Sequence, residues 1–173
     1  MGHVRRMSLA VVALIAALIA VTGQASAASQ VPFRAALTNA NATVPCPPNT
    51  PVPSFCVAIT GSGHATHMGE IQESGFVVVS VGRPCGPGCV TDFARHTITA
   101  ANGDQIVVET TGENSATADP TIRFRTGPYV VTGGTGRFSG ASGSGTATAT
   151  INMATGTSTA TFVGVQSTPG SRQ

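Results

Sequence analysis

Two histidines three residues apart, His64 and His67, are residues of a type that could bind a metal ion. They lie in the alternating segment Val57–Ile71, which predicts a β-strand. Residues three apart in a strand point to opposite faces, so the two imidazoles cannot bind one ion without a bulge. Counted along the strand by alternation, His67 falls on the same face as the apolar residues Val57, Ile59 and Ile71. We therefore expect it to face the interior, as a buried hydrogen-bonded side chain that contacts a ligand, and we expect no metal site.

A second group of ionisable residues lies near the start of a later strand. Asp92, Arg95 and His96 are close together there, and Glu109 lies on the strand expected to pair with it. If the mouth of a barrel gathers these side chains, they form an acid/base cluster. If they alternate between the faces, they are separate solvated charges. The sequence leaves both interpretations open.

Tyr129, at the end of a predicted strand, could donate a hydrogen bond inside a cavity or serve in packing alone. The candidate ligand contacts are therefore His67, Arg95, His96 and Tyr129. The sequence contains no G-x-S-x-G elbow, Cys–His pair or zinc motif. We assign no catalytic residue and expect no cofactor.

Four cysteines, Cys46, Cys56, Cys85 and Cys89, form an even set. In an exported chain such a set predicts disulfides, and three pairings are possible. Pairing within each local couple fits best, because Cys46 and Cys56 flank a proline-rich loop and Cys85 and Cys89 flank Gly-Pro-Gly. The alternative is redox or zinc chemistry. It is less favoured, because the second couple has one residue more than a C-x-x-C motif.

The elements that carry these residues are predicted to be strands. After residue 27 the chain contains 23 Thr, a single Leu and no Lys, and its Ala residues alternate with Thr. An Asn-Gly pair at 102–103 is a strong hairpin signal. Loops are expected over Asn39–Phe55 and Gly112–Pro120. The predicted strands are Val31–Leu37, Val57–Ile71, Phe76–Val81, Thr91–Ala100, Asp104–Thr110, Thr121–Val131, Gly145–Ile151 and Thr157–Val165. Eight strands without a crossover helix predict an all-β antiparallel barrel or sandwich.

The ends of the 173-residue chain have a different character. Residues 1–27 carry Arg5 and Arg6, then an apolar run too short to span a membrane, then Ala-Ser-Ala, and so resemble a secretory signal peptide. We expect the secreted form to begin at Ala28, with one domain over 28–166, a flexible tail over 167–173 and no membrane anchor. It carries seven basic and seven acidic residues. With no Lys and no clustered Arg, we expect no binding to nucleic acid.

The most distinctive stretch is Val130-Val-Thr-Gly-Gly-Thr-Gly-Arg-Phe-Ser-Gly-Ala-Ser-Gly143. Its glycines, with Gly133, Gly134 and Gly136 in front of Phe138, predict a structural turn over a barrel end, with positive φ expected at Gly134. The stretch resembles the G-G-T-G-x-F-x-x-A-x-G signature of the allene oxide cyclase/dirigent superfamily, especially its small secreted bacterial members of unknown function. This resemblance implies an eight-stranded antiparallel barrel with a central cavity.

Three functions remain open at this point. Val, Ile, Leu and Phe make up 29 of the 146 residues after the leader, so the interior is expected to be incompletely filled. A barrel of this kind could bind a small apolar molecule without covalent chemistry, which we favour. It could instead be a cyclase- or isomerase-type enzyme acting on a hydrophobic substrate. The third possibility is a structural or surface-interaction protein whose barrel is filled, for example by Phe33, Phe76, Phe93 and Phe124. The oligomeric state is left open.

Overall fold

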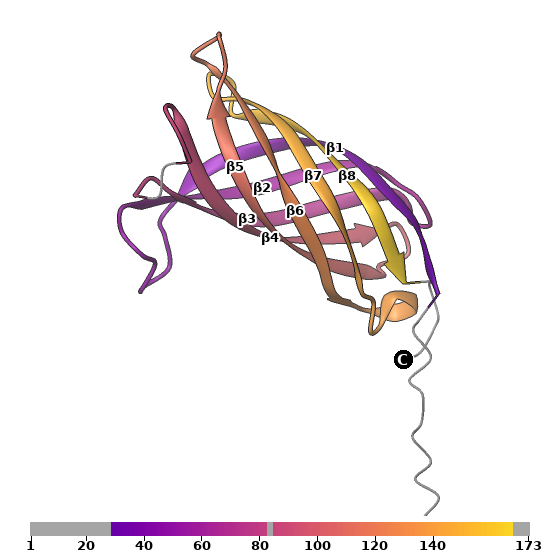
Figure 1. Ribbon diagram of the computed structural model, residues 1–173. Coiled ribbons are helices and arrows are strands. Elements are labelled where there is room, and N and C mark those ends of the chain that lie inside the picture. Colours follow the sequence, from indigo (N-terminus) through magenta and orange to yellow (C-terminus); the bar gives the residue numbers. More distant parts are fainter. Residues whose placement is uncertain (1–28, 83–84, 168–173) are drawn as a thin grey trace, which may run out of the picture.

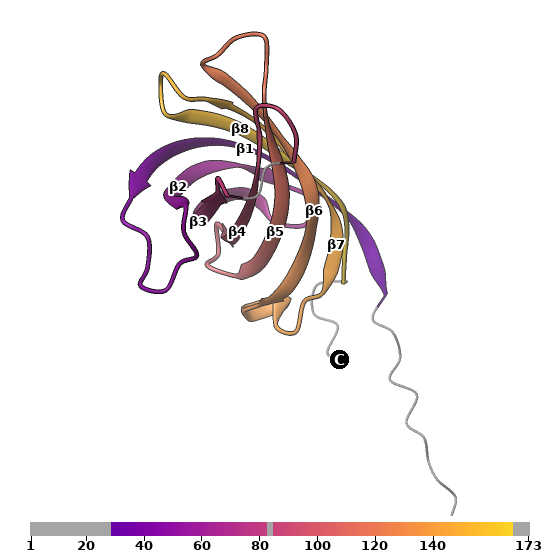
Figure 2. The same cartoon turned by 60° about the vertical axis from the view of Figure 1, so that its left-hand side comes forward.

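The chain folds into one closed barrel of eight antiparallel strands (Figures 1 and 2). The computed structural model describes residues 29–82 and 85–167, so the predicted leader 1–27 and the tail residues 168–173 lie outside the described residues. Each strand pairs with its sequence neighbours, and β8 pairs back onto β1. The strands are β1 Gln30–Val44, β2 Ser54–Ala65, β3 Gly69–Ser80, β4 Cys89–Ala100, β5 Gln105–Ala116, β6 Ile122–Gly134, β7 Gly143–Asn152 and β8 Thr157–Ser167. The predicted all-β, eight-stranded antiparallel barrel is confirmed.

Several strands run further than the sequence indicates. β1 continues through the predicted loop to Val44, which pairs with Cys56, so only residues 45–53 leave the sheet. β5 likewise continues to Ala116 through a segment predicted to be a loop. These extensions contain Asn, Gly and Glu, whose low strand propensity suggested loops, but pairing with neighbouring strands holds them in the sheet.

The predicted strand Val57–Ile71 is a hairpin of two strands. β2 ends at Ala65 and β3 begins at Gly69, and the turn between them contains His67 at φ 63°, followed by Gly69 at φ 72°. Two residues with positive φ reverse the chain here. The parity argument that placed His67 inside the barrel therefore fails, because parity does not continue through a turn.

The two ends of the barrel differ. One end is closed by the β2–β3 and β4–β5 turns and by the short 3-10 helix η1, Gly136–Phe138, which joins β6 to β7. Phe138 is 1 % exposed and packs in the core at this end, whereas Arg137 lies outside and pairs with Asp104 at 3.4 Å. Gly133 and Gly134 are the last residues of β6, and Gly136, at φ 58°, starts η1.

The interior is filled only in the half next to the closed end. Sixteen buried residues form one core there, including Phe33, Leu37, Ile98, Tyr129 and Phe162. In the other half the inward side chains are mainly aliphatic, with a few polar ones, and leave a space that opens to solvent between the other four strand connections. Of the four phenylalanines considered as a filling, only Phe33 is buried; Phe93 and Phe124 are each 44 % exposed, and Phe76 is partly exposed.

Both disulfides join the local cysteine couples, Cys46–Cys56 and Cys85–Cys89, which confirms the predicted pairing. No cysteine is free. Each disulfide lies beside a connection at the open end, where the loops enclose the unfilled half of the barrel. Among the described residues, no helix has the length and apolarity that a membrane span requires.

Candidate functional site

The unfilled half of the barrel is a cavity of about 340 Å³ that opens between the strand connections at the mouth. Its walls are mainly apolar. They are formed by inward side chains that alternate along the strands, among them Val57, Ile59, Val77, Val79, Val90, Ala94, Ala149, Ala160 and Phe162. Its volume lies within the range of small-molecule sites, which are typically apolar with a few converging polar groups.

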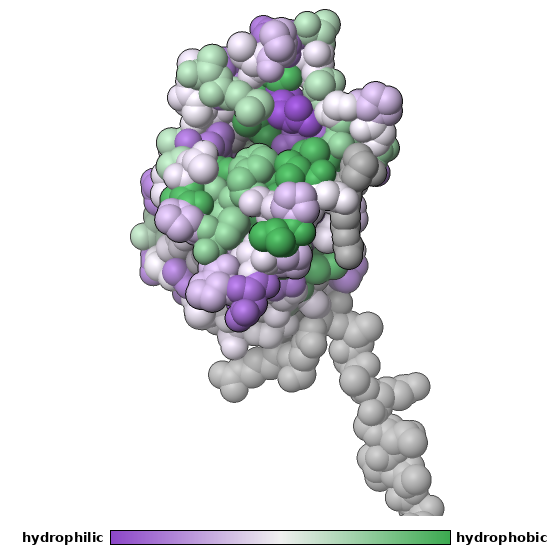
Figure 3. Space-filling model, turned by 90° about the vertical axis from the view of Figure 1, so that its left-hand side faces the viewer, coloured by the Kyte–Doolittle hydropathy of each residue, from purple (hydrophilic) through white to green (hydrophobic). Residues whose placement is uncertain are grey.

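The rim of the mouth is also apolar. Figure 3 faces this end of the molecule and shows hydrophobic residues across its middle, with hydrophilic residues around them. Four large apolar side chains on or beside the connections are exposed, namely Val52, Phe55, Val81 and Met153. An apolar solute entering the cavity therefore crosses an apolar rim.

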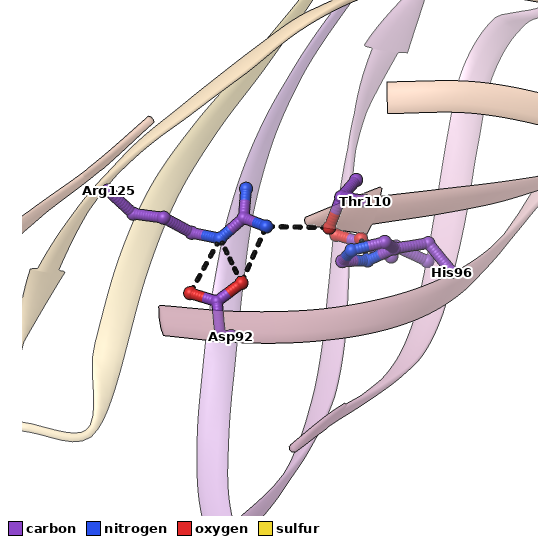
Figure 4. Close-up of polar contacts among 5 residues, drawn as sticks. Asp92, His96, Thr110 and Arg125 are labelled. Carbon is purple, nitrogen blue, oxygen red and sulfur yellow. Dashed lines mark hydrogen bonds and ion pairs between the residues drawn. The ribbon is translucent and has the colours of Figure 1, made fainter. Parts of the chain in front are cut away.

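A buried ion pair lies in the cavity wall. Arg125 on β6 donates from Nε to both carboxylate oxygens of Asp92 on β4, at 3.0 Å each, and from Nη2 to Asp92 Oδ1 at 2.7 Å (Figure 4). The same Nη2 donates to Thr110 Oγ1 at 2.7 Å. The side chains are 10 % and 1 % exposed. Such a pair is held in one geometry, because breaking it would leave a buried charge without a partner.

A second buried pair joins His96 on β4 to Glu73 on β3. His96 Nδ1 lies 2.6 Å from Glu73 Oε1, and the two side chains are 8 % and 0 % exposed. The imidazole also packs edge-on against Phe162, with ring centroids 5.6 Å apart. Glu73 Oε2 is buried and has no hydrogen-bond partner in the described part of the chain. One carboxylate oxygen of Glu73 is therefore enclosed in the cavity wall without a partner among the described residues.

Strand alternation explains why these groups face inward. On β4, Asp92, Ala94 and His96 share the inner face. On β6 the two arginines, Arg123 and Arg125, face inward while Phe124 is exposed, which reverses the usual arrangement of an apolar core. Arg123 is held by Asn114 Oδ1 at 2.7 Å and Gly88 O at 2.8 Å.

Two glycines, Gly75 on β3 and Gly112 on β5, make room for the polar side chains. A Cβ on Gly112 would lie 2.7 Å from Arg125 Cζ, and one on Gly75 would lie 2.9 Å from His96 Nδ1. Real Cβ atoms do not approach other atoms this closely, so each glycine is required for the present position of its neighbour. The residues that form the two polar pairs or contact them therefore come from five strands, β3 to β6 and β8.

The structure separates the residues proposed from the sequence. His96 lines the cavity, together with Asp92. Arg95 and Glu109 face outward and form an exposed ion pair at 3.7 Å, because they alternate with the inward residues. His67 is exposed in the β2–β3 turn at the closed end, where its Nε2 lies 3.2 Å from Pro32 O. The sequence analysis placed it in the wrong part of the molecule.

Tyr129 is buried in the filled half, below the cavity. Its ring packs edge-on against Phe33 and Phe162, with centroid distances of 6.3 and 5.5 Å. Its hydroxyl has no hydrogen-bond partner within the described residues. The sequence analysis missed two polar residues of the cavity wall, Glu73 and Arg125. The one feature that could have indicated them is that each is a charged residue at a strand position that alternates in step with inward-facing neighbours.

Burial raises the pKa of Tyr129 from 10.0 to about 12. The unfolded chain loses this proton near pH 10 and the folded chain keeps it, so the free energy of unfolding should fall as the pH rises from 10 to 12. Tyr129 is the only tyrosine, and the chain has no lysine and no free thiol. Absorbance titration of tyrosinate should therefore report this group alone, and Tyr129→Phe should remove the alkaline loss of stability. A native midpoint near 10 would contradict the burial of the hydroxyl.

Comparison of the sequence with models of protein families and with curated proteins finds no match. Comparison of the fold finds solved structures of the same architecture. The pterocarpan synthase dirigent protein GePTS1 matches with a TM-score of 0.51 and 13 % identity, over 80 % of this chain and 90 % of that one. The pterocarpan synthase dirigent protein PsPTS1 matches with a TM-score of 0.50 and 16 % identity, over 80 % and 95 %. The chain therefore has a dirigent-like barrel fold.

Proposed function

We propose that the protein binds a small, mainly apolar molecule in the open half of its barrel, after export through its leader. The observation that carries this proposal is the cavity of about 340 Å³ with aliphatic walls, which no side chain of the described residues fills. A binding site of this size and composition gains affinity from burying the apolar surface of its ligand.

The polar groups in the wall define the polar part of the ligand. Two asparagine side chains, Asn39 and Asn41, line the cavity, and each has a buried amide atom without a hydrogen-bond partner among the described residues. Leaving such atoms unpaired costs about 1–3 kcal/mol each, so a ligand that hydrogen-bonds to them gains both affinity and orientation. We infer an apolar ligand with one or two polar substituents directed toward this group.

Two further observations bear on the other functions considered. A filled barrel is not favoured, because the aromatic side chains that would fill the open half point outward. Export is supported by the two disulfides, which form and persist in oxidising compartments. The similarity to the two pterocarpan synthase dirigent proteins supports the barrel fold in which such a cavity lies, and does not indicate a particular ligand.

Native mass spectrometry of the protein purified from the medium of the cells that produce it tests this proposal. We expect a species heavier than the disulfide-bonded chain by the mass of one small organic molecule, and the loss of this added mass in organic solvent. The denatured sample, which keeps the disulfides, is the control for covalent adducts. Recovery of the bare chain alone, under conditions that preserve other barrel–ligand complexes, would count against a resident ligand.

A further inference from the structure

We propose that the cavity catalyses proton transfer at a carbon next to a carbonyl group, with His96 as the base and Arg125 as the group that stabilises the oxygen. The substrate class is an apolar ketone or enone, and the reaction is enolisation followed by reprotonation. This inference rests on the proposed function, because the substrate must first bind in the cavity. It adds a reaction to that binding site.

The first step of the argument concerns the free nitrogen of His96. Nδ1 is committed to Glu73 Oε1 at 2.6 Å. A carboxylate can only accept a hydrogen bond, so in the neutral imidazole Nδ1 carries the proton and Nε2 keeps its lone pair. Nε2 has no hydrogen-bond partner among the residues described. It is not one of the fully buried polar atoms that lack a partner, and the His96 side chain lines the cavity. His96 therefore presents a basic nitrogen to a molecule in the cavity.

The second step concerns Arg125. Asp92 occupies Nε and Nη2, and Thr110 takes a further bond from Nη2. Nη1 makes no hydrogen bond with the described residues, and Figure 4 shows it directed away from Asp92. Figure 4 also places Thr110 between the guanidinium and the His96 ring. Arg125 thus offers a fixed cationic donor on the same wall as the base.

Together these groups can complete a balanced proton transfer. His96 Nε2 takes a proton from the carbon next to the carbonyl group, so a C–H bond breaks and an N–H bond forms. The electron pair of the C–H bond becomes the C=C bond of an enolate, and the negative charge moves to the oxygen, which accepts a hydrogen bond from Arg125 Nη1. His96 then returns the proton to the same carbon or, in an enone, to the conjugated one. No oxidant or other reactant is required.

The surroundings of the pair favour this chemistry. Glu73 stabilises the imidazolium that forms, and its side chain is fully buried. Asp92 fixes the position of Arg125, so the donor does not need to reorganise when charge develops on the oxygen. The apolar walls lower the local dielectric constant and so strengthen both interactions. Glu73 is accordingly a positioning residue and His96 a catalytic one.

A purely structural role for the two pairs makes a different prediction. In a purely structural pair, the two side chains use up each other's hydrogen-bonding groups and leave no polar atom free to contact a ligand. Here two polar atoms on cavity-lining side chains have no partner among the described residues and are not enclosed: His96 Nε2 and Arg125 Nη1. The pairs leave functional groups available where an apolar carbonyl compound would bind.

The experiment measures hydrogen–deuterium exchange in two apolar ketones, β-tetralone and β-decalone. The protein is incubated with each ketone in D₂O, and proton NMR follows loss of the signal next to the carbonyl group, while calorimetry on the same samples measures binding. The variants are His96→Gln, Glu73→Gln and, as a control on an exposed histidine far from the cavity, His67→Ala.

We expect the wild type and His67→Ala to exchange about 100-fold faster than buffer alone. His96→Gln should return exchange to the buffer rate with the Kd changed less than about threefold, and Glu73→Gln should lower the rate without changing the Kd, which a structural role would not produce. Binding without accelerated exchange in the wild type, or full exchange in His96→Gln, would overturn the inference and leave the proposed function intact. Failure of both ketones to bind would overturn the two together.

Discussion

Replacement of Gly134 by Val should lower the free energy of unfolding by about 3 kcal/mol, through crowding of the backbone where β6 meets η1. A Cβ at this position would lie 2.4 Å from Gln105 O, 2.6 Å from Phe138 O and 2.9 Å from Phe138 Cβ. Two of these atoms belong to the backbone, so a rotamer change cannot relieve the contact. Chemical denaturation monitored by circular dichroism measures the loss.

The cause differs from the one that the sequence suggests. The glycine-rich pattern predicts positive φ at Gly134, but Gly134 is not among the glycines with positive φ. Gly140→Ala in the same segment is the matched control, since Gly140 has φ 72° and a Cβ there would meet nothing within 4 Å. We expect it to cost about 1 kcal/mol, from backbone conformation alone. Equal losses for Gly134→Val and Gly140→Ala would show that crowding at Gly134 has no effect.

Replacement of Asp92 by Ala should destabilise the barrel by about 3 kcal/mol, because it leaves the Arg125 guanidinium buried without its carboxylate. Asp92 accepts three of the four hydrogen bonds that Arg125 makes, and its side chain is 1 % exposed. The same measurement of unfolding by denaturant applies. The exposed pair Arg95–Glu109 provides the reference, since Glu109→Ala should change stability by less than about 0.5 kcal/mol.

A double variant separates the charge from the loss of side-chain volume. Asp92→Leu with Arg125→Met removes both charges and keeps apolar bulk, so we expect it to be more stable than Asp92→Ala by at least about 1 kcal/mol. If Asp92→Ala alone unfolds no more easily than the wild type, the guanidinium is not held in the cavity wall by Asp92.

The fold could be predicted from the sequence because two independent signals agree. Alternation of Val, Ile, Thr and Ala marks strands, and the turn residues fall at regular spacing, as at Asn102-Gly103. These signals leave a barrel and a sandwich open, and the resemblance of the glycine-rich stretch implied the barrel. The disulfide pairing followed from chain proximity. The boundaries were less accurate, because β1 holds residues of low strand propensity that pairing on both sides keeps in the sheet.

The cavity wall was harder to predict because charged residues there replace apolar ones on the inner face. Arg125 alternates with Phe124, and hydrophobicity alone places the phenylalanine inside, whereas the structure places the arginine there. Its carboxylate partner lies 33 residues away on β4, so the contact depends on the order and register of β4, β5 and β6. His67 was misplaced for a local reason. The alternation of side chains looked continuous from Val57 to Ile71, but a turn at His67 interrupts it.

Blocking the cavity tests the central claim most directly. Ala149 lines the cavity on β7, next to Ala160 of β8, and Ala149→Phe should fill part of the space without disturbing the core of the closed half. Ala42→Phe adds the same ring on the exposed outer face of β1 and is the control. Fluorescence titration with Nile red, an uncharged apolar probe, measures binding. We expect saturable binding to the wild type and to Ala42→Phe and at least a tenfold weaker affinity in Ala149→Phe; equal affinity in all three proteins would contradict binding inside the barrel.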